Sequence, residues 1–257
     1  MTLDHSPAGL ATLFAEIGRQ LQAYGRTADA MDAVAHTAVQ RVPGSEWASI
    51  SQGHKGTFIT VASTDPGAVA VDKIQYELRS GPCVDAILQE TVFRIDDLRT
   101  DARWPEMGER AVSAGVRSML SLRLFLENDD LVAGLNMYAT RTNAFDDNAQ
   151  TIGILLATHG ALAISAAAAR ERAAQLRQAL VTSREIGVAM GVLMSLHKTT
   201  RDQAFDLLRI ASQNTNRKLA DIATEVGDTG TIDLPGRWAG IVPPSPSAAP
   251  LGPLPDE

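Results

Sequence analysis

A group of cationic and amide side chains near the carboxyl end of the chain has the residue types of an anion-binding surface. Lysine and arginine neutralise phosphates, and glutamine and asparagine amides hydrogen-bond exposed base edges. Residues 170–227 carry nine Lys and Arg against six Asp and Glu, a net charge of +3 in a chain whose net charge is −7. This pattern indicates an anionic partner such as nucleic acid, with an ordinary solvated helix face as the alternative. The candidate binding residues are Lys198, Arg201, Arg209, Gln213, Asn216, Arg217 and Lys218.

Three amphipathic helices are expected to position these side chains around a small common core. Thr200 and Gln203 have the spacing of a capping box, so the second helix begins at Thr200. Asn216 is expected to be the N-cap of the third helix, and Gly227 its C-terminal stop. Apolar residues at intervals of three and four mark the three buried faces. They are Ile186, Ala189, Met190 and Leu193, then Ala204, Leu207, Leu208 and Ala211, then Leu219, Ile222, Ala223 and Val226.

A long helix is expected to lead into this module. It opens at Asn143–Asp147, and the charged stretch Ala169–Arg177 contains no helix breaker, so it continues or restarts after a kink. Gly187 and Gly191 each cost roughly 1 kcal/mol against alanine in a helix, which predicts that another helix packs closely there. Such a helix serves either as a simple linker or as a dimerisation element.

The residues before this helix predict an α+β domain in which helices flank an antiparallel sheet. Alternating apolar residues predict strands, and the 3.6-residue period predicts helices. A turn at Thr64–Gly67 and a short helix or loop are expected before Tyr76. The expected helices are 10–24, 28–42 and 106–114, and the expected strands are 47–51, 57–63, 91–96, 119–126 and 131–139, with turns at 53–56 and 127–130.

Few residues suggest covalent or metal chemistry. The single cysteine, Cys83, excludes an intramolecular disulfide and suits a reducing cytoplasm. Cys83 is expected to be a buried small hydrophobe, with a redox sensor and a chromophore anchor as alternatives. The five histidines lack metal-ligand spacing and no catalytic motif is present, so we predict no enzyme activity, metal or cofactor. The apolar stretch 152–169 is expected to be a helix of a soluble protein rather than a membrane span.

Three segments together resemble a GAF domain of the actinobacterial type. They are Tyr76–Asp85, Ile95–Pro105 and Gly115–Leu124, and the strand Leu131–Tyr138 followed by Ala144–Asp147 completes the pattern. The resemblance covers about residues 8–168. It implies a five- or six-stranded antiparallel sheet with helices, and a sensor role in which a small-molecule ligand is possible.

The carboxyl-terminal stretch resembles an ANTAR domain, the RNA-binding module of transcription antitermination regulators. Met190 stands where many relatives have a lysine, which removes one RNA contact. The resemblance implies that the module binds paired stem-loops in an mRNA leader and so prevents a terminator hairpin, which calls for a homodimer. The matching residues are Ala189–Met194, Ala204, Leu208, Arg209, Ala211, Ser212, Asn216, Lys218, Leu219, Ile222 and Ala223.

We therefore predict a cytoplasmic RNA-binding antitermination regulator with a GAF sensor domain at 8–168. An ANTAR module with its linker helix is expected at 169–227, and a disordered proline-rich tail at 228–257. One alternative is a DNA-binding transcriptional regulator with a GAF ligand-sensing domain, because Leu219–Gly227 resembles part of a helix-turn-helix. Another is a signalling protein whose last helices only dimerise or bind a protein partner.

Overall fold

The computed structural model describes residues 7–21, 24–54, 56–89, 92–126 and 132–234. The predictions for the turn at 127–130 and for most of the tail lie outside these residues. The chain divides into two compact units, residues 1–172 and residues 173–257, which are considered separately below.

The first unit is built on a five-stranded antiparallel sheet, as predicted. The strand order is β2-β1-β5-β4-β3, and every neighbouring pair is antiparallel. β1 runs three residues beyond the expected end at Ser51, because His54 still pairs with Thr57 of β2. The strands are β1 (Trp47–His54), β2 (Thr57–Ser63), β3 (Val92–Ile95), β4 (Ser118–Leu124) and β5 (Val132–Ala139).

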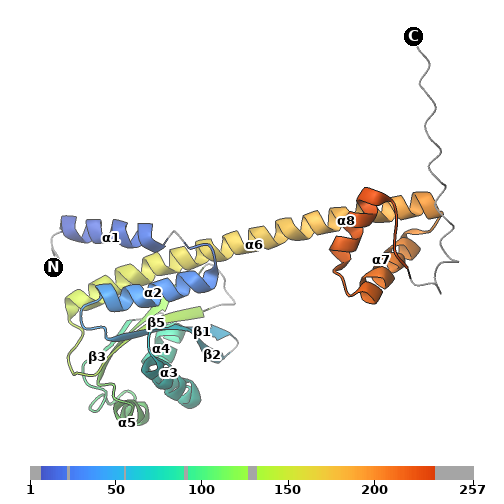
Figure 1. Ribbon diagram of the computed structural model, residues 1–257. Helices are drawn as coiled ribbons and strands as arrows, with labels where there is room; N and C mark the ends of the chain where they lie inside the picture. The colour runs from blue at the N-terminus through green and yellow to red at the C-terminus, as the bar shows by residue number, and fades with distance from the viewer. Residues whose placement is uncertain (1–6, 22–23, 55, 90–91, 127–131, 235–257) are drawn as a thin grey trace. The chain divides into compact units, whose positions relative to one another are not determined.

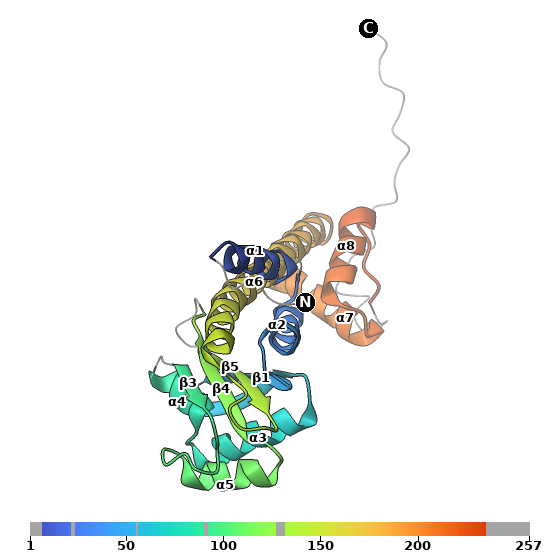
Figure 2. The same cartoon turned by 90° about the vertical axis from the view of Figure 1, so that its left-hand side faces the viewer.

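Helices cover both faces of the sheet (Figures 1 and 2). One face packs against α2 (Thr27–Arg41) and the first part of α6 (Asp147–His197), and α1 (Pro7–Leu21) packs on α2 farther from the sheet. The other face packs against α3 (Pro66–Leu78), α4 (Pro82–Gln89) and α5 (Pro105–Ser113). Successive side chains of a strand point to opposite faces, so Leu135 and Met137 of β5 reach the first layer and Asn136 and Tyr138 the second.

The segment between β2 and β3 is more helical than expected. The predicted turn at Thr64–Gly67 is the start of α3, where the Asp65 carboxylate accepts a hydrogen bond of 2.7 Å from the Gly67 N–H. Pro66 occupies the first turn, where its missing N–H costs nothing. The segment expected to be a short helix or loop is therefore a helix of 13 residues.

α6 is one continuous helix of 51 residues, so the prediction of a helix continuing through the charged stretch is confirmed. Glu171 of α6 accepts hydrogen bonds from the Thr27 hydroxyl at 2.8 Å and from the Thr27 N–H at 3.3 Å. Glu171 thereby caps α2, whose own N-cap residue Arg26 makes no side-chain cap. By length and composition alone α6 is apolar enough to cross a membrane, but half of its most apolar window is buried in the protein, as in a core helix.

A polar network lies buried between the sheet and α3. The Asp72 carboxylate accepts hydrogen bonds from the Tyr138 hydroxyl, from the Thr60 hydroxyl at 2.8 Å and from the Asn136 amide at 3.2 Å. Asp72, Asn136 and Tyr138 are fully buried. Burial raises the pKa of Asp72 to about 6, although the hydrogen bond from Tyr138 and the weaker ones oppose the shift.

Cys83 belongs to the same buried layer. Its Sγ lies 3.1 Å from the Asn136 amide nitrogen, and its side chain is fully buried. Burial, followed by the nearby Asp72 carboxylate, raises the pKa of the thiol to about 12. The thiol is therefore protonated and shielded at neutral pH, which supports a packing role over a reactive one.

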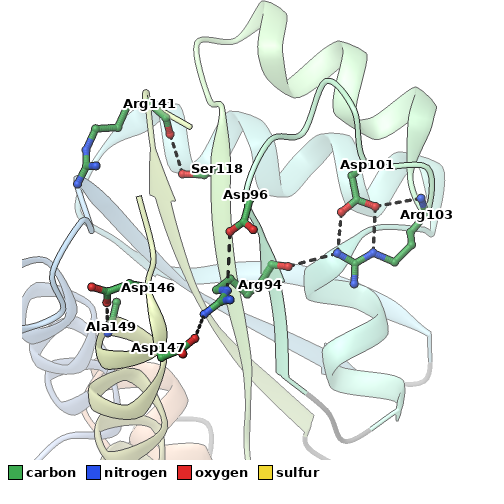
Figure 3. A network of polar contacts seen from close by, with 9 residues as sticks. All are labelled: Arg94, Asp96, Asp101, Arg103, Ser118, Arg141, Asp146, Asp147 and Ala149. Atoms are coloured by element: carbon green, nitrogen blue, oxygen red, sulfur yellow. Dashed lines mark hydrogen bonds and ion pairs between the residues drawn. The ribbon is translucent and has the colours of Figure 1, made fainter. Parts of the chain in front are cut away.

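Figure 3 shows that the acidic loop after β3 is tied down by arginines. Arg94 contacts the Asp147 carboxylate at 2.6 Å and the Asp96 carboxylate at 3.7 Å, and Arg103 contacts Asp101 at 2.6 Å. The Asp146 carboxylate accepts a hydrogen bond of 2.8 Å from the Ala149 N–H and so caps the start of α6. These carboxylates fix the loop and the start of α6.

Candidate nucleic-acid interface

The second unit has a small core made by the end of α6 and by α7 (Arg201–Thr215) and α8 (Leu219–Thr229). α7 and α8 lie side by side (Figures 1 and 2). The predicted apolar faces are confirmed, with Ile186, Met190 and Leu219 only partly buried. The fully or almost fully buried members are Ala189, Leu193, Ala204, Leu207, Leu208, Ala211, Ile222, Ala223 and Val226.

The capping box predicted from Thr200 and Gln203 fixes the turn between α6 and α7. The Thr200 hydroxyl accepts a hydrogen bond of 3.3 Å from the Gln203 N–H, and the Gln203 side chain accepts one of 2.9 Å from the Thr200 N–H. Lys198 follows the end of α6 in the left-handed region, at φ 56°. Lys198 and Arg201 are thereby held at the same end of α7, and both are exposed.

The turn between α7 and α8 corrects two predictions. Asn216 is the C-cap of α7, at φ 53°, and not the N-cap of α8, because asparagine tolerates the left-handed conformation that ends a helix. Lys218 is the N-cap of α8 and makes no side-chain cap. Gly227 does not end α8, which runs on to Thr229 and closes at Gly230, at φ 69°.

All seven predicted binding residues are exposed, but six of them lie in two groups at the two ends of α7, with Arg209 between the groups. Lys198 and Arg201 lie at the start of α7. Arg209 lies midway along the helix. The remaining four, Gln213, Asn216, Arg217 and Lys218, gather at its far end. A helix of 15 residues is about 22 Å long, so the two groups are separated by several nucleotide spacings.

Two of the five cations are already paired with carboxylates. The Arg209 guanidinium lies 2.8 Å from Asp206, and that of Arg217 lies 2.7 Å from Glu225. Within the described residues no ion pair involves Lys198, Arg201 or Lys218. These three cations are therefore free to meet phosphates without first breaking an internal contact.

The exposed side of α8 has the opposite charge. Asp221, Glu225 and Asp228 are exposed on it, and Leu219–Thr229 contains no lysine or arginine. A helix that carries such carboxylates is repelled by a phosphate backbone. The anion-binding part of this unit is therefore α7 with its two flanking turns.

Among the described residues of this chain, no other helix packs closely on Gly187 or Gly191, so the expected close contact is not made within the chain. A Cβ built on either glycine has no neighbouring atom within 4 Å. The sequence interpretation also missed Phe205 of α7, which is 42% exposed. The sequence did contain a signal for this exposure, because Phe205 lies outside the buried stripe formed by Ala204, Leu207 and Leu208.

Two family models match the chain, and their boundaries follow the two units. The GAF domain model matches residues 26–165, more than half of the chain, so the chain belongs to the GAF domain family. The ANTAR domain model matches residues 174–226, so this is a GAF domain protein that carries a following ANTAR domain. Both are regulatory domains and not catalytic ones, and they serve signal transduction and transcription regulation.

Several solved structures are similar to this chain at low sequence identity. A bacteriophytochrome from R. palustris matches with a TM-score of 0.56 and 12% identity, over 81% of this chain and 48% of that one. The GAF domain of a phosphoenolpyruvate-protein phosphotransferase from Coxiella burnetii matches with a TM-score of 0.48 and 16% identity, over 63% of this chain and 96% of that one. fRMsr of Staphylococcus aureus matches with a TM-score of 0.49 and 15% identity, over 64% and 99%. No curated protein sequence matches the chain.

Proposed function

We propose that this protein is an RNA-binding regulator of transcription antitermination, controlled by its GAF domain. The observation that carries the proposal is the ANTAR match at 174–226, which coincides with the unit that displays all seven predicted binding residues. The proposal includes a small-molecule ligand for the GAF domain and a cytoplasmic location. We assign the sensor to 8–168 and the RNA-binding module with its linker to 169–227, extended to Thr229 by the observed end of α8.

The proposed mechanism is steric. Lys198, Arg201 and Lys218 contact RNA phosphates, and the amides of Gln213 and Asn216 hydrogen-bond unstacked loop bases. Arg209 and Arg217 join after exchanging their carboxylate partners for phosphates. By holding stem-loops of a nascent mRNA leader, the module prevents the competing terminator hairpin from forming.

RNA is a better partner than duplex DNA for this surface. In a helix-turn-helix protein the second helix enters the major groove, and here that helix would be α8. Its exposed carboxylates, Asp221, Glu225 and Asp228, would lie between two phosphate strands. The cations lie instead at the two turns, where they can contact a folded RNA loop. This charge distribution supports the RNA proposal over the DNA alternative.

A homodimer is part of the proposal, and the face of α6 within the second unit supports it. Leu176 is 66% exposed and Leu180 is 71% exposed, and Gly187 and Gly191 leave open space farther along the helix. Apolar and small residues at intervals of three and four are typical of a helix that packs against a second copy. Two modules would then bind the two stem-loops.

The double variant Leu176→Glu, Leu180→Glu is expected to convert the protein from dimer to monomer. Each substitution places a carboxylate where a leucine would be buried against the partner helix, and like charges would face each other across the pair. Sedimentation equilibrium of the full chain at micromolar concentration measures the change. Ile59→Glu, at an exposed position of β2, is the matched control and should remain dimeric. A monomeric wild-type protein would remove this part of the proposal.

Arg201→Gln and Lys218→Gln are each expected to weaken RNA binding about fivefold to tenfold and to reduce its salt dependence, because each removes one free phosphate contact. Arg209→Gln should have a smaller effect, because Asp206 already neutralises that guanidinium. Gel-shift titrations at several salt concentrations, using RNA selected from a pool of two-hairpin RNAs with randomised loops, measure these effects.

Arg177→Gln supplies the control for a general loss of positive charge. Arg177 is exposed on α6 and lines neither of the hollows found along that part of the helix. Its replacement should leave RNA affinity within about twofold of the wild type, with unchanged helicity in all variants. Equal losses from Arg177→Gln, Arg201→Gln and Lys218→Gln would show that binding follows net charge and not the proposed surface.

A further inference from the structure

An open hollow beside Phe205 is a feature of the second unit that the surface described above does not use. Its volume is about 650 Å³, and α6 supplies most of its lining. Ala179 and Ile186 of α6 and Phe205 of α7 contribute apolar side chains to its lining, and Gln175, Gln178 and Ser183 contribute polar groups. This volume lies within the range of about 300–1,000 Å³ that is typical of small-ligand sites.

We propose that this hollow receives an unpaired base of the bound RNA, which stacks on the Phe205 ring. The inference rests on the proposed RNA-binding function and assigns to it a base-binding site. Proteins that recognise single-stranded RNA bind splayed-out bases on aromatic side chains and hydrogen-bond their edges. Phe205 offers the exposed ring, and the amides of Gln175 and Gln178 offer donors and acceptors for a base edge.

The charges around Phe205 favour a nucleotide as the occupant. Arg201 and Arg209 lie four residues before and after Phe205, so all three share one side of α7. Arg201 is exposed and has no ion pair among the described residues, and Lys198 lies in the turn before it. A base in the hollow would bring its phosphate toward these cations. The base-binding site therefore extends the group at the start of α7.

A second copy of the chain is the less suitable occupant. The most exposed leucines of α6, Leu176 and Leu180, do not line the hollow. The hydroxyl and amide groups that line the hollow, on Gln175, Gln178 and Thr182, would need hydrogen-bond partners if a protein surface covered them.

Phe205→Leu and Phe205→Tyr in the full chain test the assignment. Leucine keeps an apolar side chain but removes the ring, whereas tyrosine keeps the ring. Binding of the selected two-hairpin RNA is expected to weaken about tenfold or more with leucine and to stay within about threefold of the wild type with tyrosine. RNAs with 2-aminopurine placed at each loop position in turn should show one position whose fluorescence is quenched by the wild type and by Phe205→Tyr, but not by Phe205→Leu.

Val181→Ala provides the matched control, because Val181 is 51% exposed on α6 but borders a different hollow, beside α8. It should bind RNA like the wild type. If the wild type binds the RNA and Phe205→Leu binds it equally well, the base site is wrong and the proposed function stands. If Phe205→Leu turns a dimer into a monomer in sedimentation equilibrium, the occupant is a second copy. If the wild type binds none of the RNAs in the pool, the proposed function itself fails.

Discussion

Leu208→Ala is expected to unfold the three-helix unit while the sheet unit stays folded. Leu208 is fully buried among the apolar residues of α6, α7 and α8. Replacing a buried leucine with alanine costs about 2–5 kcal/mol, because the lost contacts and the remaining cavity both count. A helical module of this size has a small core and correspondingly little stability to spare, so one such substitution removes most of it.

Two thermal unfolding signals separate the units. Trp104 and Trp47 pack in the core of the sheet unit, and in a Trp238→Phe background their fluorescence reports on that unit, whereas far-ultraviolet circular dichroism reports on the helices of both units. Leu208→Ala should lose part of its helicity at low temperature, keep the fluorescence transition and lose RNA binding. Leu196→Ala, at a partly exposed position of α6, should behave like the wild type. If fluorescence and circular dichroism instead show one common transition, and Leu208→Ala lowers its midpoint temperature in both signals, the two units unfold together.

Asp72→Asn is expected to stabilise the sheet unit at neutral pH relative to the wild type. The Asp72 carboxylate is fully buried, and its three hydrogen-bond donors, Tyr138, Thr60 and Asn136, are neutral. Asparagine has nearly the same shape, still accepts at its oxygen and carries no charge to desolvate. The other titratable groups packed against Asp72 are Tyr76 and Cys83, whose pKa values are raised by burial, so neither supplies a positive charge.

The sign of the pH dependence follows from the raised pKa. Burial moves the pKa of Asp72 from 3.8 to about 6 in the folded protein. Below pH 3.8 the carboxyl is protonated in both states and costs nothing. Between pH 4 and pH 6 the unfolded chain ionises first, so wild-type stability falls as pH rises, by roughly 3 kcal/mol in total. Above pH 6 the cost is constant. The free energy of unfolding of Asp72→Asn should therefore rise relative to that of the wild type between pH 4 and pH 6. Above pH 6 the difference should stay constant.

Urea unfolding of wild type and Asp72→Asn from pH 4 to pH 7.5, followed by tryptophan fluorescence in the same Trp238→Phe background, measures this difference. The other titrating groups are common to both proteins and cancel in the comparison. Asp32→Asn, at an exposed position of α2, should show no comparable change across the same range. A difference between Asp72→Asn and wild type that stays flat with pH would mean that the carboxyl is not protonated preferentially in the folded state.

Local patterns predicted the elements whose determinants are themselves local. The Thr200–Gln203 capping box and the stripe Ala204, Leu207, Leu208 depend on spacing within one helix, and both are found in the structure. Strand alternation likewise predicted the sheet. Asn216 could serve at either end of a helix, because its side chain suits an N-cap and its backbone tolerates the left-handed region. Only the packing of α8 against α7 decides between these two positions.

The sequence pattern did not predict the full length of α3, and tertiary contacts in the sheet unit explain why. α3 buries Val71 and Ala68 but also Asp72 and Gln75, so its buried face is half polar and its amphipathic pattern is weak. Those polar residues meet Asn136 and the other polar side chains of the sheet, which a single sequence cannot pair with them. In the candidate interface the exposure of the seven binding residues was predictable. Their separation into two groups and the ion pairs of two arginines depend on distances across the folded unit.

Direct comparison of RNA with duplex DNA tests the central claim, that the carboxyl-terminal unit is an RNA-binding module. The full chain is titrated into fluorescent two-hairpin RNA from the selected pool, and separately into a DNA duplex of equal length, at several salt concentrations. We expect binding to the RNA that weakens with salt, with a slope of about −4 for the six free cations of the two modules of a dimer, or about −2 if only one module binds. The affinity for the DNA duplex should be at least about a hundredfold lower. Equal or tighter binding to the duplex would contradict the account. So would the absence of binding to either nucleic acid at every salt concentration.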